Sequence, residues 1–285
     1  MDILTNATDI ITVTPDTSIN DVLQKMQSNF IKHVIVKAKN KPVGIVTERD
    51  IDKFLENDKT AKALEEISVE QVMEKNLVTV TDGASDCISQ AARRMHTLKI
   101  GSVITVDSNG NLAGMITKTD ITKVYGTVYG AKFKVKDQMS EKVFTCRESD
   151  SLRFALNMIN ENKISRLVVT DNNGRPIGVI TSNSFLVHRS YFTKGKTRTR
   201  EHHLLSADSE NMCIGDLVSK DLLAVNLEDD LSVAAQKMIK NHIHGMPVID
   251  DADRLVGVVS NSDIVRAFVK VPLTKELLEK YSELY

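Results

Sequence analysis

The chain has 285 residues, of which 41% are hydrophobic and 26% are charged, a balance typical of a globular protein with a buried core and about two domains. Its formal net charge of −1 gives no overall attraction to nucleic acid or to an anionic membrane. The absence of tryptophan and an aromatic content of 5% count against an aromatic-lined cofactor cavity.

The three cysteines, Cys87, Cys146 and Cys213, are widely separated and form no CxxC pair. An odd, scattered set of this kind is typical of a reducing compartment. No apolar run approaches the roughly 18 residues that cross a bilayer, and residues 1–10 lack a basic-then-apolar signal pattern. We therefore expect a cytoplasmic protein with no membrane partner.

Residues 10–51 contain the first run of predicted elements. A β-rich run at 10–13 precedes an amphipathic helix, whose apolar residues are spaced i, i+3, i+4 and i+7. A short β-rich run, HVIV at 33–36, and a second apolar run that carries the stretch GIVTERDI at 44–51 are separated by the polar stretch KNKP at 39–42. Two short strands joined by a turn of this composition form a hairpin. Because the last run leads into a helix start, the unit reads β-α-β-β-α.

The same order of elements recurs three more times. Each copy contains a phrase of glycine, two apolar residues and Thr or Ser, and three copies place an aspartate three residues later. The four phrases are GIVTERDI (44–51), GMITKTDI (114–121), GVITSNSF (178–185) and GVVSNSDI (257–264). The helix stripes ahead of them are Ile19, Val22, Leu23 and Met26; Ile88, Ala91, Ala92 and Met95; Leu152, Ala155, Leu156 and Ile159; and Leu231, Ala234, Ala235 and Met238. Three of these helices follow a residue that favours an N-cap, namely Ser18, Ser151 and Asp230.

We predict an α/β (α+β) protein of four β-α-β-β-α repeats, arranged as two tandem-pair modules. The expected boundaries are 1–60 for repeat 1, 61–128 for repeat 2, 129–190 for repeat 3, 191–209 for a basic insert, 210–271 for repeat 4 and 272–285 for a short C-terminal amphipathic helix.

This pattern resembles the cystathionine-β-synthase (CBS) domain, a module of this size whose signature ends in the same glycine phrase. The fourth copy, HIHGMPVID (242–250) followed by LVGVVSNSDI (255–264), is an especially close match. Four copies in a row resemble the gamma subunit of AMP-activated protein kinase and stand-alone archaeal proteins. That resemblance implies that copies one and two form one module, and copies three and four the other.

The glycine phrase has two interpretations. In the first, Thr47 and Asp50 form a capping box, in which the hydroxyl accepts from a helix amide and the carboxylate reaches back. In the second, the carboxylate accepts hydrogen bonds from the paired hydroxyls of a ribose, and the helix N-terminus attracts phosphate. The resemblance implies the second role for Asp50, Asp120 and Asp263, with Thr47, Thr117 and Ser260 beside them.

The resemblance also places phosphate and base contacts just after an isoleucine that follows each repeat's first helix. The further ligand contacts that it implies are Thr12, Ile31, His33, Thr79, Ile100, Ser102, Arg166, Thr181, Ile243, His244 and Pro247. The third phrase has Ser184 in place of the acid and Phe185 in place of isoleucine, so we expect this site to be empty or weak. Because paired copies face each other in the family, Arg166 is expected to serve the ligand of the fourth copy.

These features predict a non-catalytic regulatory protein that binds AMP, ADP or ATP, with S-adenosylmethionine as another candidate ligand. Outside the repeats there is no serine–histidine–acid or paired-carboxylate constellation. His242 and His244 have no cysteine or acid cluster at ligand spacing, so we expect no metal site. The regulated partner is unknown, and a homodimer is compatible with the pattern.

The stretch HRSYFTKGKTRTREHH at 188–203 permits another interpretation. On charge alone it is a solvated loop. A sharper hypothesis is an RNA contact, with cationic groups on phosphates and aromatic rings on unpaired bases, which would make the chain a ligand-regulated RNA-binding protein. The residues concerned are Arg189, Tyr191, Lys194, Lys196, Arg198 and Arg200. A third alternative is a structural scaffold whose acids only cap helices.

Overall fold

The computed structural model describes residues 5–6, 10–29, 31–58, 62–84, 86–181, 184, 212–218, 221–272, 274, 276–277 and 279. The described residues up to Asp120 form one compact unit, and those from Ile121 onward form a second. The basic insert at 191–209 and most of the predicted helix at 272–285 lie outside the described residues. Within those residues, no helix has the length and apolar character needed to cross a membrane.

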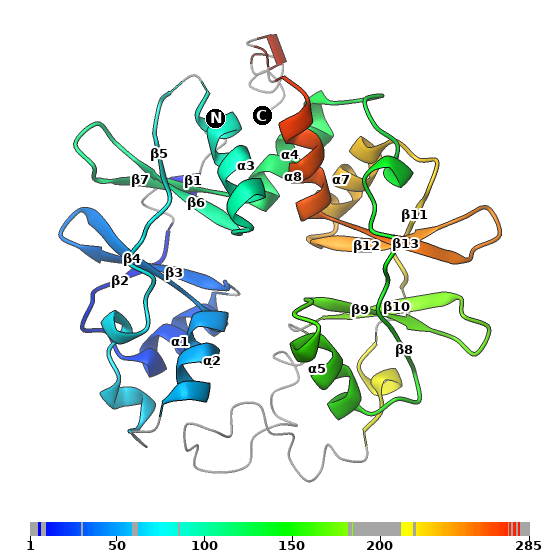
Figure 1. The fold of residues 1–285 in the computed structure, drawn as a ribbon, viewed down its shortest axis with the longest axis horizontal. Coiled ribbons are helices and arrows are strands. Elements are labelled where there is room, and N and C mark those ends of the chain that lie inside the picture. The colour runs from blue at the N-terminus through cyan, green and yellow to red at the C-terminus, as the bar shows by residue number, and fades with distance from the viewer. Residues whose placement is uncertain are drawn as a thin grey trace. The chain divides into compact units, whose positions relative to one another are not determined.

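The first unit contains two of the repeats (Figure 1). The elements of repeat 1 are β2 (Thr12–Val13), α1 (Ile19–Ser28), β3 (His33–Ala38), β4 (Lys41–Thr47) and α2 (Glu48–Asn57). The elements of repeat 2 are β5 (Thr79–Thr81), α3 (Cys87–Leu98), β6 (Ser102–Val106), β7 (Leu112–Thr117) and α4 (Lys118–Val128), the last of which runs on into the second unit. In each repeat, the first strand pairs in parallel with the second, which pairs antiparallel with the third.

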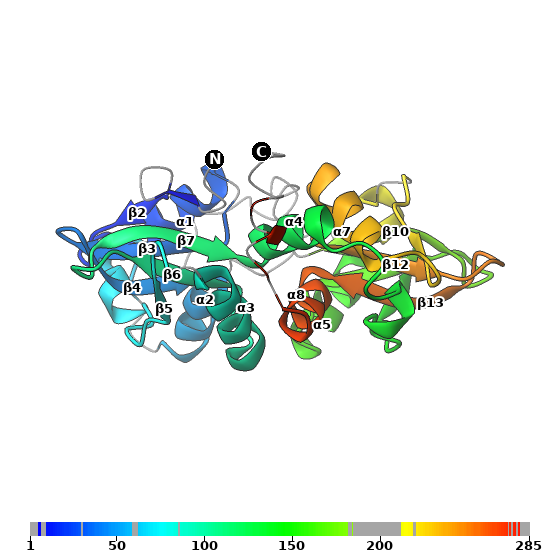
Figure 2. The same ribbon diagram turned by 90° about the horizontal axis from the view of Figure 1, so that it is seen from above.

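The second unit repeats this arrangement. Repeat 3 has β8 (Thr145–Arg147), α5 (Leu152–Glu161), β9 (Arg166–Thr170) and β10 (Pro176–Thr181), and the helix predicted after β10 is described only at Ser184. Repeat 4 has β11 (Val225–Asn226), α7 (Leu231–Lys240), β12 (Gly245–Ile249), β13 (Leu255–Ser260) and α8 (Asn261–Lys270). Helices α7 and α8 contact each other beside this last sheet (Figures 1 and 2). The prediction of an α/β fold of four repeats is confirmed.

Local chemistry explains why these elements begin and turn where they do. The hydroxyls of Ser18 and Ser151 accept from Asp21 and Phe154 amides, and the Asp230 carboxylate accepts from the Ser232 amide, so all three predicted N-caps are confirmed. Three of the hairpin turns begin with an aspartate that accepts two backbone amides, each at 2.8–3.0 Å. These aspartates are Asp107, Asp171 and Asp250.

The apolar stripes of the helices pack onto the sheets. In repeat 1, Ile19, Val22 and Met26 are buried against strand residues that include Val34 and Val46. The equivalent stripe residues of α3, α5 and α7 are buried as well, and they are Ala91, Ala92, Met95, Leu152, Ala155, Ile159, Leu231, Ala234, Ala235 and Met238. The helical periodicity in the sequence therefore marks the core side of each helix.

The segment that precedes a repeat packs on the other repeat of its pair, which the sequence did not indicate. The 3-10 turns η1 (Leu64–Glu66) and η2 (Val69–Gln71) precede repeat 2 but hydrogen-bond to repeat 1, where the Ile19 amide donates to Ile67 at 2.9 Å. Strand β1 (Thr5–Asn6) precedes repeat 1 but pairs with β7 of repeat 2.

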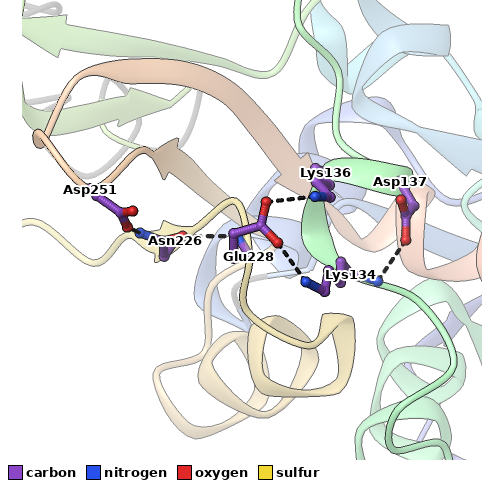
Figure 3. A network of polar contacts seen from close by, with 6 residues as sticks. All are labelled: Lys134, Lys136, Asp137, Asn226, Glu228 and Asp251. Carbon is purple, nitrogen blue, oxygen red and sulfur yellow. Dashed lines mark hydrogen bonds and ion pairs between the residues drawn. The ribbon is translucent and has the colours of Figure 1, made fainter.

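In the second unit this exchange is reciprocal. The turn η3 (Val135–Asp137) precedes repeat 3 but docks on repeat 4, and the turn η6 (Ile214–Asp216) precedes repeat 4 but docks on repeat 3. Figure 3 shows how the first of these segments is fixed, with the carboxylate of Glu228 between the ammonium groups of Lys134 and Lys136, at 2.5 and 2.6 Å. Each repeat of the pair therefore holds the chain that leads into the other.

Candidate ligand-binding sites

Two motif segments come together at the end of each repeat's hairpin. The first residue of the middle strand lies directly across from the Thr or Ser of the glycine phrase. The four cross-strand pairs are His33 with Thr47, Ser102 with Thr117, Arg166 with Thr181 and Gly245 with Ser260. The hydroxyl and the first residue of the middle strand therefore lie side by side in each repeat, and repeats 1, 2 and 4 add the acid one turn into the helix.

The acids of repeats 1, 2 and 4 are held in place by their own helix starts. The amide and hydroxyl of Thr47 both donate to Oδ2 of Asp50, at 2.8 and 2.6 Å. Thr117 donates in the same way to Asp120, with both bonds at 2.7 Å. Ser260 donates to Asp263, from its amide at 2.8 Å and from its hydroxyl at 2.7 Å. The capping box is therefore present. All six of these bonds go to Oδ2, and in repeat 4 the other oxygen, Oδ1, pairs with Arg266.

A further hydrogen bond fixes the spacing between the two motif segments. In repeats 1, 2 and 4, the first helical amide donates to the carbonyl of the residue after the isoleucine, at 3.1–3.2 Å. The pairs are Glu48 with Lys32, Lys118 with Gly101, and Asn261 with His244. The side chains of His244 and Asn261 also approach each other, with Nδ1 and Nδ2 3.3 Å apart. The two motif segments are thus joined by backbone contacts.

Repeat 3 keeps the cap without the carboxylate. The Thr181 amide donates to Oγ of Ser184 at 3.1 Å, and the Ser184 amide donates to Oγ1 of Thr181 at 3.3 Å. A hydroxyl pair can start a helix, but it offers no charged acceptor to a sugar. Phe185 lies outside the described residues.

Repeat 4 is supplemented by a cation from repeat 3. The guanidinium of Arg166 lies against Gly245, where a β carbon would overlap its Nη1 and would lie 2.7 Å from the carbonyl oxygen of Val259. Asp263, which is 7% exposed, attracts this guanidinium and so opposes the fall in the pKa of Arg166 that burial causes. A glycine at position 245 therefore leaves the space through which Arg166 reaches the fourth site.

A second cation touches the same acid and was missed by the sequence reasoning. Nη2 of Arg266 lies 2.8 Å from Oδ1 of Asp263, the oxygen that the capping box does not use. The available signal was a basic residue three positions after each acid, which recurs as Lys53 and Lys123. Arg266 thus pairs directly with the carboxylate that also attracts Arg166.

In repeat 1, the equivalent position carries an imidazole. His33 is the first residue of β3 and is partly buried, and burial lowers its pKa. Its ring is therefore neutral near pH 7 and can accept or donate a hydrogen bond through its two nitrogens.

The remaining residues implied by the resemblance lie nearby or within the sheets. Thr12 and Thr79 lie on the short parallel strands, opposite Ile35 and Ile104. Pro247 is buried within β12, opposite Val258. Ile31, Ile100 and Ile243 are partly buried in front of the middle strands. These residues lie in or beside the sheets, whereas the polar groups lie at the hairpin ends.

The proposed RNA contacts, Arg189, Tyr191, Lys194, Lys196, Arg198 and Arg200, lie outside the described residues. Within the residues that the structure does describe, no group of three or more His, Cys, Asp or Glu side chains could hold a metal ion.

Comparison with known proteins places the repeats in a family. The model of the CBS domain matches this chain four times, over residues 2–57, 69–126, 134–190 and 214–270. Protein MJ1225 of Methanocaldococcus jannaschii is 24% identical over 273 residues, which are 91% of this chain and 95% of that protein. Its crystal structure, described as that of a proposed archaeal homolog of g-AMPK, superposes with a TM-score of 0.73 over 93% of this chain and 98% of its own.

Two further proteins show how far the similarity extends. Protein MJ1404 of the same organism is 26% identical over 262 residues, which are 90% of this chain and 59% of that protein. The crystal structure of a conserved protein from Pyrococcus horikoshii has a TM-score of 0.67 at 19% identity, covering 94% of this chain and 98% of that one. The similarity thus covers nearly all of this chain, of MJ1225 and of the Pyrococcus horikoshii protein, but only 59% of MJ1404.

Proposed function

The chain belongs to the CBS domain family, and from this premise we propose that it is a non-catalytic sensor of adenine nucleotides. Its ligands bind where the glycine phrase meets the middle strand, in repeats 1, 2 and 4. Asp50, Asp120 and Asp263 accept hydrogen bonds from the ribose diol, and the residues across the hairpin contact the phosphate.

The observation that carries this proposal is the position of Arg166. A cation that crosses from one repeat to the acid of the next is costly to bury unless a partner compensates for the lost solvation. Asp263 compensates in part, but Arg266 already pairs with that carboxylate. A phosphate group beside Arg166 supplies the remaining negative charge, and the ribose attached to it reaches Asp263.

The same charges select among adenine ligands. Arg166 and Arg266 attract a nucleoside phosphate, whereas the sulfonium of S-adenosylmethionine carries a positive charge that both would repel. We therefore expect repeat 4 to prefer AMP, ADP or ATP. Repeat 1, with a neutral His33 in the equivalent place, discriminates less by charge.

Binding in repeat 4 joins two repeats, because its acid and its cation come from different ones. A ligand that contacts both favours the conformation in which repeats 3 and 4 are packed, and it shifts that equilibrium only by its differential affinity for the two states. A regulated partner that reads the packed surface would then respond to nucleotide concentration.

Thermal denaturation of the full chain with AMP, ADP, ATP and S-adenosylmethionine tests this function. A ligand at 100 times its dissociation constant adds about 2.7 kcal/mol to the free energy of unfolding. Asp263→Asn should reduce the response while keeping a side-chain oxygen for the cap. Asp250→Asn, which changes a hairpin turn of the same repeat, should leave the response intact. No response to any of the four ligands would refute the proposal.

A further inference from the structure

The segment that leads into repeat 3 contains a buried polar side chain at a position that is apolar in the equivalent segments. Three such segments align as VEQVM (69–73), VKDQM (135–139) and IGDLV (214–218). Their fourth position holds Val72, Gln138 and Leu217. Val72 and Leu217 pack against the apolar cores of repeats 1 and 3, and Gln138 is only 2% exposed. A buried polar residue among apolar equivalents indicates a specific partner.

The partners of Gln138 are two basic residues of helix α8. Its side-chain oxygen Oε1 lies 3.4 Å from Nε of Arg266 and 3.2 Å from Nζ of Lys270. Its backbone carbonyl accepts a short hydrogen bond from Nη2 of Arg266. Gln138 therefore holds the guanidinium of Arg266 through both its backbone and its side chain.

The same nitrogen of Arg266 contacts the acid of the fourth site. Nη2 donates to the carbonyl of Gln138 and lies 2.8 Å from Oδ1 of Asp263. The other carboxylate oxygen, Oδ2, is fixed by Ser260. An unbroken series of contacts thus runs from the segment before repeat 3 to the carboxylate of repeat 4.

We propose that Gln138 is a positioning residue for the fourth site: it acts through Arg266 to orient Asp263, and it couples ligand occupancy to docking of segment 134–140. The proposal rests on the nucleotide-binding function proposed above. A guanidinium held by Gln138 points its Nη2 at Oδ1 and sets the plane of the carboxylate before the ribose arrives. A preorganised acceptor binds more tightly because less side-chain freedom is lost on binding.

Coupling of this kind works in both directions. If docking of the segment tightens binding at Asp263, occupancy of the site must stabilise the docked segment by the same factor. The rest of the segment is held independently, by the Glu228 carboxylate at one end and by the bridge between Ser140 and Val258 at the other. A change at Gln138 can therefore alter the coupling while the segment stays in place.

The test uses the full chain carrying Asp50→Asn and Asp120→Asn, so that AMP reports on repeat 4. Gln138→Leu introduces the kind of residue found at Val72 and Leu217, and it should fold as the parent does. Gln138→Glu keeps an acceptor for Arg266 and Lys270. The control is Gln71→Leu, which changes an exposed glutamine of the corresponding segment.

The readouts are the dissociation constant for AMP by calorimetry, the unfolding temperature without ligand, and hydrogen exchange of residues 134–140. Gln138 acts on the ligand only through Arg266, so we expect its loss to matter about as much as one ordinary hydrogen bond: Gln138→Leu should weaken AMP binding about three- to tenfold, without lowering the unfolding temperature. Gln138→Glu and Gln71→Leu should bind within about twofold of the parent. AMP should slow exchange at 134–140 in the parent and not in Gln138→Leu.

Arg266→Lys provides a second route to the same contact, because lysine occurs at the equivalent positions Lys53 and Lys123 and cannot bridge both partners. If Gln138 acts on the site only through Arg266, the double variant Gln138→Leu/Arg266→Lys should bind AMP no more weakly than the weaker-binding single variant. Additive losses, or parent-like affinity of Gln138→Leu, would overturn the inference while leaving the nucleotide function intact. Failure of the parent to bind AMP at millimolar concentration would overturn both.

Discussion

Replacing Gly245 by alanine tests whether Arg166 occupies the fourth site. The β carbon of the new residue would overlap Nη1 of Arg166 and would lie 2.7 Å from the carbonyl oxygen of Val259. The arginine side chain can swing away, but the Val259 carbonyl is part of strand β13 and can move only with the hairpin. Overpacking of a well-packed site costs about 1–3 kcal/mol, so we expect a loss of stability in that range.

Chemical denaturation and AMP titration measure the two consequences of Gly245→Ala. Besides the loss in the free energy of unfolding, the displaced guanidinium should cost the phosphate contact, and binding at repeat 4 should weaken about tenfold or more. Gly130→Ala is the control, since Gly130 lies outside the proposed sites and nothing lies within 4 Å of its new methyl group. Unchanged stability and affinity in Gly245→Ala would refute the placement of Arg166.

Three other changes test separate parts of the structure. Thr105→Val removes a fully buried hydroxyl that has no hydrogen-bond partner, at a strand position where the other repeats have valine, so the free energy of unfolding in urea should rise by about 1 kcal/mol. Thr170→Val, which loses a hydrogen bond to Cys146, should not raise it. A loss of stability in Thr105→Val would contradict this reasoning. Burial lowers the pKa of His33 in the folded chain, so the unfolded chain binds a proton at higher pH, and the free energy of unfolding should fall as the pH drops below about 6.5. In melts at a series of pH values, His33→Gln should reduce this dependence of stability on pH. An unchanged dependence would show that His33 is not its source. Gly44→Ala, whose methyl group would overlap the sulfur of Met73, should destabilise repeat 1 by about 1–3 kcal/mol in urea denaturation, and a neutral result would contradict the close packing of that segment.

The elements of the fold were predictable because each has a strong local signal. The stripe of Ile19, Val22 and Met26 has helical spacing, and the hydroxyl of Ser18 caps the helix by accepting the Asp21 amide. The aspartates that begin three of the hairpin turns bind the backbone two and four residues on, which explains why such residues stand there. These contacts are formed within short stretches of chain, so a repeat can be recognised without its partner.

The exchange of segments between paired repeats could not be predicted in the same way. The turns at Leu64–Glu66, Val135–Asp137 and Ile214–Asp216 are three residues long, too short to show a period. Their contacts join residues far apart along the chain, such as the Val135 amide and the Asp229 carbonyl. Sequence order alone therefore assigns each segment to the repeat that follows it rather than to the repeat that holds it.

The arrangement of side chains at the fourth candidate site was predicted in part, although their role in binding stays a prediction. The positions of Asp263 and Ser260 follow from the repeated phrase, and that of Arg166 beside repeat 4 follows from the pairing of copies that the resemblance implies. Arg266 and Gln138 were missed, because a basic residue on a helix is usually solvated and a single glutamine among apolar residues carries no motif. Only the fold brings the two within hydrogen-bond distance.

The ligand itself offers the most direct test of the claim that carboxylates at the helix starts hold a ribose diol. Binding of ATP and of 2′,3′-dideoxy-ATP to the full chain should be compared by calorimetry. The two share the base and the phosphates, so a diol held by Asp50, Asp120 or Asp263 predicts that the dideoxy compound binds about ten- to a hundredfold more weakly. Equal affinity for both compounds, or no binding of either, would contradict the account.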